Sequence, residues 1–101
     1  MLETISIIGA GSWGTALAIH LAGKFRQISL WVYENDLCDT LTQSRENKWF
    51  LPGHPLPCNI QPTSSLKTAI KGQTIILLVV PTHVIRETLK QIKPFLEKDC
   101  L

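Results

Sequence analysis

The sequence predicts an α/β fold in which a parallel β-sheet carries helices on both faces. Three observations support this prediction. Short, β-branched, apolar runs alternate with helix-like segments in the order β-α-β-α-loop-β-α-β-α. The run at residues 74–80 is aliphatic or β-branched throughout, which is typical of a parallel strand covered on both faces. The 101 residues suffice for one domain, and 45% apolar against 18% charged residues excludes a disordered chain.

The first two elements are a strand and a helix. Residues 4–8 are short, apolar and β-branched and end at Gly9, which predicts a buried strand. Residues 15–22 are rich in alanine and precede Gly23, which predicts a helix that ends at this glycine. Glycines and polar residues interrupt the uncharged stretch at residues 5–23, so we expect no signal peptide and no stable membrane insertion.

The second strand is predicted at residues 28–33. An asparagine and an aspartate shortly after it are helix-start residues for a segment that reaches roughly residues 43–46. Residues 47–62 include four prolines, so we expect a long connection there, with a short strand near residues 59–61.

Two further helices are expected on either side of the last strand. Ser64 is the predicted N-cap of a helix at residues 65–70, which Gly72 closes. Thr82 is the predicted cap of a final helix over residues 83–92, with a proline beyond its end.

Charge and cysteine content exclude several classes of protein. The net charge is only +2, from 10 Lys and Arg against 8 Asp and Glu, and no basic cluster stands out, so no nucleic-acid partner is expected. The dispersed cysteines form no C-x-x-C pair, which disfavours a disulfide framework and a zinc site. The three cysteines are Cys38, Cys58 and Cys100. We therefore expect a cytoplasmic protein without a metal site.

Residues 9–14 match the G-x-G-x-x-G pattern between a strand and a helix. Gly9 permits the tight turn, Gly11 lets the backbone approach a pyrophosphate, and Gly14 allows close packing of helix on strand. The N–H groups of the first helical turn have no intrahelical partners, and the helix dipole adds positive potential there. The pattern predicts a Rossmann-type cofactor site formed by Gly9, Ala10, Gly11, Ser12, Trp13 and Gly14. The alternative is a glycine-rich turn that binds no ligand.

Glu34 lies twenty residues after Gly14, where such sites place a carboxylate that accepts the ribose hydroxyls of the cofactor. An acid there repels a 2′-phosphate, so the predicted cofactor is NAD, with NADP also possible. Tyr33 is predicted to cover the adenine face. The alternatives are a helix-terminal acid for Glu34 and a packing aromatic for Tyr33. The three tryptophans are interpreted as packing residues.

Three segments carry a family resemblance. Residues 9–18 (G-A-G-S-W-G-T-A-L-A) form an opening motif, residues 45–57 combine an asparagine with L-P-G-x-x-L-P, and residues 79–83 read V-V-P-T-H. The first motif is shared by many dehydrogenases. In this order and spacing, the three together resemble the NAD(P)-dependent glycerol-3-phosphate dehydrogenase family, over about residues 5–95.

The resemblance implies an enzyme that interconverts dihydroxyacetone phosphate and sn-glycerol 3-phosphate by hydride transfer with NAD(P)H. In bacteria this reaction supplies the backbone of membrane phospholipids. The resemblance adds Pro81 and Val84 to the expected cofactor contacts, and Tyr33 with Glu34 looks more like the NAD-using members. Residues 1–101 then form the N-terminal dinucleotide-binding domain, with four of the roughly six strands of such a fold.

The resemblance also implies a part of the protein that this chain does not contain. The catalytic lysine of the family is expected beyond Leu101, in a helical C-terminal domain that binds the small phosphate substrate. No catalytic residue is therefore assigned within this chain, and the isolated chain is expected to be inactive. We expect the full-length protein to form a homodimer.

Two other functions share part of this pattern. An NAD-sensing regulatory Rossmann module without catalysis would carry the glycine loop and Glu34, but has no reason to carry the segments at residues 51–53 and 80–82. Another dehydrogenase of similar architecture would act on a different hydroxy acid. Activity on dihydroxyacetone phosphate separates these three functions.

Overall fold

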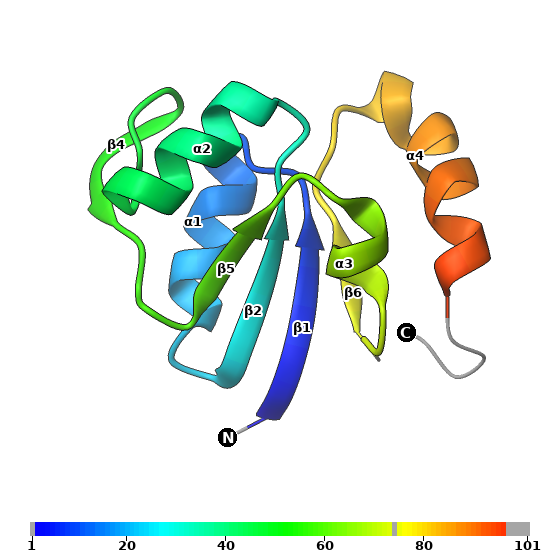
Figure 1. Ribbon diagram of the computed structural model, residues 1–101, viewed down its shortest axis with the longest axis horizontal. Helices are drawn as coiled ribbons and strands as arrows, with labels where there is room; N and C mark the ends of the chain where they lie inside the picture. Colours follow the sequence, from blue (N-terminus) through cyan, green and yellow to red (C-terminus); the bar gives the residue numbers. More distant parts are fainter. Residues whose placement is uncertain (1, 74, 97–101) are drawn as a thin grey trace.

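The computed structural model describes residues 2–73 and 75–96. Its main sheet has the strand order β5-β2-β1-β6, and each neighbouring pair runs parallel. Figure 1 shows these strands side by side at the centre of the molecule. They are β1 (Leu2–Ile8), β2 (Phe25–Trp31), β5 (Ile60–Thr63) and β6 (Ile76–Leu78). The predicted parallel sheet is confirmed.

Helices lie on both faces of this sheet, as predicted (Figure 1). One face is covered by α1 (Ser12–Leu21) and α2 (Asn35–Ser44). The other face is covered by α3 (Leu66–Ile70) and α4 (Ile85–Ile92), and the short 3₁₀ helices η1 (Thr82–Val84) and η2 (Lys93–Phe95) flank α4. None of the helices in the described part of the chain combines the length and hydrophobicity needed to span a bilayer.

Alternation along the strands explains why both faces are covered. Successive side chains of a strand point to opposite faces. Ile7 and Leu30 therefore pack in the cluster that includes residues of α1 and α2, whereas Ile8 and Trp31 pack with residues of α3 and α4. A sheet with apolar side chains on both faces needs helices on both, because an open face would expose them to water.

The strand order reverses between β1 and β6. The chain passes from β1 to β2 and β5 on one side, and then returns to place β6 on the other side of β1. The loops that leave β1 and β6 therefore diverge at their carboxyl ends, which is where open parallel sheets bind ligands. The fold is of Rossmann type, and the glycine-rich loop after β1 lies at this point.

The proline-rich region contains more structure than the sequence predicts. β3 (Glu46–Asn47) and β4 (Leu51–Pro55) pair antiparallel in a separate small sheet. The connection, which lies wholly within the described residues, is long and contains no helix, as expected, but the hairpin within it was not predicted. Proline lacks only the N–H donor and is tolerated in an edge strand. The Glu46 carboxylate adds a bond by accepting from the N–H of Gly53 at 3.0 Å. The short strand expected near residues 59–61 is confirmed as β5.

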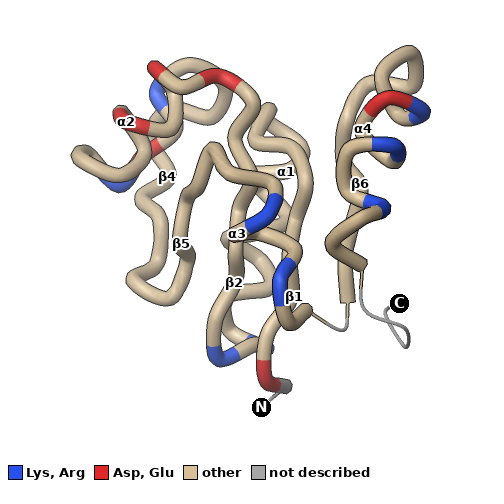
Figure 2. Tube along the Cα trace, turned by 45° about the vertical axis from the view of Figure 1, so that its right-hand side comes forward, with Lys and Arg blue, Asp and Glu red and all other residues tan. Residues whose placement is uncertain are grey.

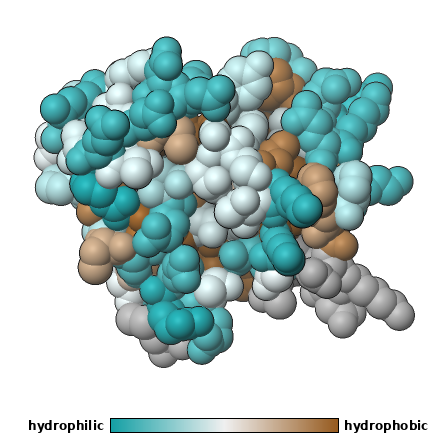
Figure 3. All heavy atoms as spheres, viewed as in Figure 1, coloured by the Kyte–Doolittle hydropathy of each residue, from teal (hydrophilic) through white to brown (hydrophobic). Residues whose placement is uncertain are grey.

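β6 is shorter and more exposed than expected. It covers Ile76–Leu78, and Thr74 lies outside the described residues. Residues 75–80 are half-buried rather than covered on both faces, since β6 pairs with β1 alone within the described sheet. Hydrophobic residues accordingly reach the surface beside α4 (Figure 3). An edge strand keeps one side open, whatever the hydrophobicity of its sequence.

Both predicted helix caps on this side of the sheet need correction. Ser65, rather than Ser64, caps α3, and its hydroxyl accepts from the N–H of Thr68 at 3.2 Å. The Ser64 carbonyl instead accepts from the indole N–H of Trp31 at 3.1 Å. Thr82 caps no helix through its side chain, because the chain first forms η1 and enters α4 from it. A local pattern does not distinguish adjacent serines whose roles depend on a distant tryptophan.

Candidate functional site

A cavity of about 580 Å³ opens at the carboxyl ends of β1 and β2, beside the segment that follows β6. The glycine loop forms one wall, and α4 forms the opposite wall. Its lining residues are Gly9, Ala10, Gly11, Trp31, Tyr33, Glu34, Phe50, Val79, Pro81, Val84, Glu87, Thr88 and Gln91. Seven of the ten residues predicted to contact a cofactor are therefore brought together here.

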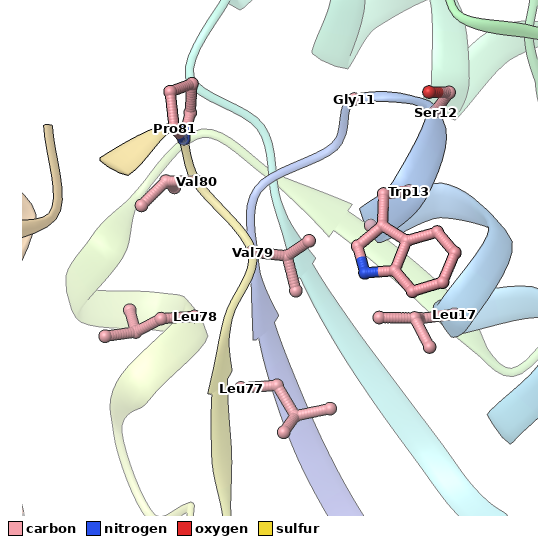
Figure 4. Close-up of a pocket in the computed structure, with 10 residues that line it drawn as sticks. Gly11, Ser12, Trp13, Leu17, Leu77, Leu78, Val79, Val80 and Pro81 are labelled. Carbon is pink, nitrogen blue, oxygen red and sulfur yellow. The ribbon is translucent and has the colours of Figure 1, made fainter. Parts of the chain in front are cut away.

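A second cavity, of about 590 Å³, lies on the other side of the glycine loop (Figure 4). It is lined by the start of α1, which includes the remaining predicted residues Ser12, Trp13 and Gly14, and by residues 77–81. Figure 4 shows the Val79 side chain pointing toward Trp13, while Val80 points the opposite way. The two cavities share Gly11, Val79 and Pro81, so they adjoin each other at the loop.

Two of the three loop glycines are required by packing within the chain. Gly9 has a φ of +128°, and a Cβ there would overlap the carbonyl oxygen of Val79. A Cβ on Gly14 would overlap the carbonyl oxygen of Gly9. These glycines let β6 and α1 approach the end of β1, as the sequence predicts for a tight turn and close helix packing.

Gly11 is different, because neither its backbone conformation nor the packing of the described residues requires a glycine there. Its φ of −71° and ψ of −169° are open to any residue. A Cβ on Gly11 would meet no atom within 4 Å. The missing side chain therefore leaves open space at the point that both cavities share.

The first turn of α1 presents unpartnered backbone donors to this space. Gly11 is the N-cap, and the first helical bond runs from the N–H of Thr15 to the Gly11 carbonyl at 3.0 Å. Among the hydrogen bonds of the described residues, none uses the N–H of Ser12, Trp13 or Gly14. These donors and the helix dipole favour an anion. No Lys or Arg lies in the loop itself, so its favourable interaction with an anion comes from backbone groups and not from basic side chains of the loop (Figure 2).

Tyr33 and Glu34 follow β2 at the same end of the sheet. Tyr33 is 78% exposed, and only the edge of its ring meets Trp31, at 5.9 Å between ring centroids. Packing therefore does not account for Tyr33. Glu34 is the half-buried N-cap of α2, but its side chain makes no capping hydrogen bond. Glu34 is among the residues that line the cavity.

The interpretation of the tryptophans as packing residues holds for one of them. Trp31 is buried, whereas Trp13 is 69% exposed and Trp49 is 50% exposed. The prediction is wrong for these two because Trp13 lies in the first turn of α1, beyond the end of the sheet, and Trp49 lies on the β3–β4 hairpin. Trp49 meets Phe50 edge-on, at 6.3 Å between ring centroids.

Several residues of the site were missed by sequence reasoning. Phe50 reaches the first cavity from the β3–β4 hairpin. Glu87, Thr88 and Gln91 reach it from α4. The spacing of these three positions places them on one face of a helix, and the sequence shows that spacing. The sequence near them does not indicate which face of the helix lines a cavity.

Asn47 was also missed, although it lies in a quoted family segment. Its side chain is fully buried, and its amide group donates to the Ala10 carbonyl at 2.8 Å and to the Thr15 hydroxyl at 2.7 Å. Its side-chain oxygen accepts from the N–H of Phe50 at 3.1 Å. Asn47 therefore attaches the hairpin to the glycine loop.

The described residues contain no group of three or more His, Cys, Asp or Glu that could hold a metal ion. Burial raises the pKa of the Cys38 thiol above its ordinary value, but Cys38 belongs to α2 and packs within the core. Cys58 is exposed, and Cys100 lies outside the described residues.

Comparison with known proteins gives the family. Residues 4–101 match the family described as the NAD-dependent glycerol-3-phosphate dehydrogenase N-terminus. The chain belongs to this family. It is 46% identical over 98 residues to the glycerol-3-phosphate dehydrogenase (NAD(P)+) of Moorella thermoacetica, which covers 97% of this chain and 29% of that relative. It is also 46% identical over 100 residues to the enzyme of the same name from Desulfotalea psychrophila, covering 99% of this chain and 30% of the relative.

A solved structure agrees with this assignment. The crystal structure of glycerol-3-phosphate dehydrogenase from Coxiella burnetii superposes with a TM-score of 0.93 at 38% identity, covering 98% of this chain and 30% of that one. The chain thus spans about 30% of the length of the relatives that it matches. The resemblance inferred from the three sequence segments is confirmed.

Proposed function

We propose that this chain is the dinucleotide-binding part of an oxidoreductase that interconverts dihydroxyacetone phosphate and sn-glycerol 3-phosphate with NAD(P)H. The observation that carries the proposal is the open space at Gly11 together with the N–H groups of Ser12 and Trp13 beside it, which have no partner in the described structure. Neither backbone conformation nor packing requires a glycine at this position. A ligand that approaches the backbone closely provides the missing reason.

The shape and polarity of the site suit a dinucleotide. Such a ligand has two nucleoside halves joined by a pyrophosphate, and two cavities adjoin each other at Gly11. The N–H groups of Ser12 and Trp13 donate to the pyrophosphate, and the dipole of α1 stabilises its charge. When bound, the nicotinamide gives or accepts the hydride. The chain's own residues bind and orient the cofactor, and no residue here is assigned a proton-transfer role.

The adenosine half is assigned to the cavity that contains Tyr33 and Glu34. The Glu34 carboxylate accepts the ribose hydroxyls, and its charge disfavours the 2′-phosphate of NADP. The exposed Tyr33 ring covers the adenine. Pro81 and Val84 contact the same ligand from the segment after β6. NAD is therefore the preferred cofactor, with NADP as a second.

The remaining functions belong to the intact protein. We propose that residues 1–101 are its N-terminal dinucleotide-binding domain, and that a helical domain beyond them holds the phosphate substrate and the catalytic lysine. The product then feeds glycerophospholipid synthesis. Cytoplasmic location, homodimer formation and the lack of a nucleic-acid partner stay predictions.

Replacement of Gly11 tests the proposal directly. In the intact protein, Gly11→Val should raise the Kd for NADH about a hundredfold or more, because the added side chain fills the space of the pyrophosphate. Titration calorimetry measures the affinity. Gly23→Val is the matched control, since a Cβ at Gly23 likewise meets no atom within 4 Å but lies at the other end of the sheet. Gly11→Val that binds NADH like the wild type refutes the placement.

Enzyme assays separate the proposed reaction from its alternatives. The intact protein should oxidise NADH in the presence of dihydroxyacetone phosphate, followed by absorbance at 340 nm. NADH binding without turnover would instead indicate an NAD-sensing regulatory module. Turnover of another hydroxy acid alone would indicate a different dehydrogenase.

A further inference from the structure

The peptide between Ala10 and Gly11 is held from outside the glycine loop. The Ala10 carbonyl accepts from the Asn47 amide at 2.8 Å and from the Thr15 hydroxyl at 3.3 Å. The Asn47 amide also donates to the Thr15 hydroxyl at 2.7 Å. Asn47 and Thr15 are both fully buried, so water does not compete for these bonds.

This arrangement constrains a backbone donor beside the open space at Gly11. A trans peptide is planar, so its N–H points opposite to its carbonyl. Holding the Ala10 carbonyl toward Asn47 therefore sets the direction of the Gly11 N–H. Glycine gives this peptide more rotational freedom than any other residue would. Gly11 leaves open space at the loop but also allows the Ala10–Gly11 peptide to rotate. The Asn47 amide restricts this rotation.

The same side chain links the loop to a second wall of the site. The side-chain oxygen of Asn47 accepts from the N–H of Phe50, and Phe50 lines the first cavity. Both amide hydrogens of Asn47 are used, so its orientation is determined. A rotation of Asn47 would break bonds to the loop and to the hairpin together.

We propose that Asn47 is a positioning residue that orients the Ala10–Gly11 peptide for the pyrophosphate of the dinucleotide. This role rests on the proposed function. The proposed role differs from that of a residue that only stabilises the fold, because the peptide that Asn47 holds adjoins the open space at Gly11. Asn47 lies 37 residues along the chain from Ala10 and acts on the ligand only through the loop.

The test compares Asn47 with Asn59, whose side-chain amide also donates two hydrogen bonds. Asn59 donates to the Ala22 and Phe25 carbonyls at 2.8 and 3.0 Å, at the opposite end of the sheet. In the intact protein, Asn47→Ala should raise the Kd for NADH about tenfold or more, whereas Asn59→Ala should leave it within about twofold. The KM for NADH should rise in Asn47→Ala, while kcat at saturating NADH stays within about twofold. Thermal unfolding should show a loss of stability in both variants.

A second pair of variants decides the question if Asn47→Ala does not fold. Thr15→Val keeps the size of the side chain but removes the hydroxyl, whereas Thr15→Ser keeps the hydroxyl. Thr15→Val should weaken NADH binding about fivefold or more, and Thr15→Ser should bind within about twofold of the wild type. Wild-type affinity in folded Asn47→Ala or in Thr15→Val overturns the inference. Wild-type protein that binds neither NADH nor NADPH overturns the proposed function itself, and the inference with it.

Discussion

At each end of the parallel sheet, an asparagine amide from a distant segment donates hydrogen bonds to a turn. The two ends differ in the backbone groups beside that turn. At the carboxyl end, Asn47 donates two hydrogen bonds to the glycine loop. At the amino end, Asn59 donates two hydrogen bonds across the turn between α1 and β2. Both amides come from the segment between α2 and β5. Each therefore anchors a turn of the main sheet to a distant part of the chain.

The difference lies in the backbone groups beside Asn47 and beside Asn59. At the amino end the turn contains one internal bond, in which the N–H of Lys24 donates to the Leu21 carbonyl at 2.8 Å. At the carboxyl end the described structure gives no partner to the N–H of Ser12 or Trp13, and cavities lie on either side. The two asparagine contacts are thus similar, but the unpaired donors at the carboxyl end lie beside two cavities. Unpaired donors that adjoin a cavity mark the functional end.

The largest expected effect on stability is at Gly9, which distinguishes structural from functional glycines at the carboxyl end. Gly9→Ala places a Cβ against the Val79 carbonyl and strains a φ of +128°. We expect a loss of about 3 kcal/mol or more in the free energy of unfolding, measured by urea denaturation. Gly23→Ala at the amino end should change it by less than about 1 kcal/mol. Equal stability of the two variants would contradict the packing assigned to the glycine loop.

An intermediate effect is expected at Glu34, and it concerns ligand choice at the carboxyl end. Glu34→Gln removes the charge that repels a 2′-phosphate, so the affinity for NADPH relative to NADH should rise about fivefold. Competitive titration of the intact protein measures this ratio. Asp36→Asn is the matched control, because Asp36 lies in the first turn of α2 and does not line the cavity. An unchanged ratio in Glu34→Gln would place the adenosine ribose elsewhere.

The smallest effect is expected for the ion pair at the amino end. Arg26 and Glu3 meet at 3.1 Å, but their side chains are 64% and 79% exposed. Exposed pairs contribute little, so Glu3→Gln should change the free energy of unfolding by no more than about 0.5 kcal/mol. Differential scanning calorimetry at two salt concentrations measures it. A loss above about 1 kcal/mol would mean that charge, and not the Asn59 amide, holds this end together.

Local patterns accounted for the elements and for the identity of the loop. Apolar, β-branched runs predicted β1 and β2, although β2 begins at Phe25 rather than Ile28 and ends at Trp31 rather than Tyr33. The buried parts of these strands need such residues. The roles of Gly9 and Gly14 followed from the close approach of backbone that the motif demands. These inferences hold because the cause and its effect lie within a few residues of each other.

Other features followed only from contacts between distant residues. The exposure of β6 depends on which strands pair with it, and not on its own hydrophobic sequence. The β3–β4 hairpin formed despite its prolines, and its Asn47 found partners 37 and 32 residues away. The face of α4 that lines the cavity was set by how the helix packs.

The sequence by itself determined the family, the parallel sheet and the place where the backbone is left bare, because glycine spacing and hydrophobic periodicity act locally. The tertiary structure alone decided which side chains hold that backbone in position. A buried amide finds its partners only when segments far apart in the chain are packed together, and no local pattern encodes that meeting.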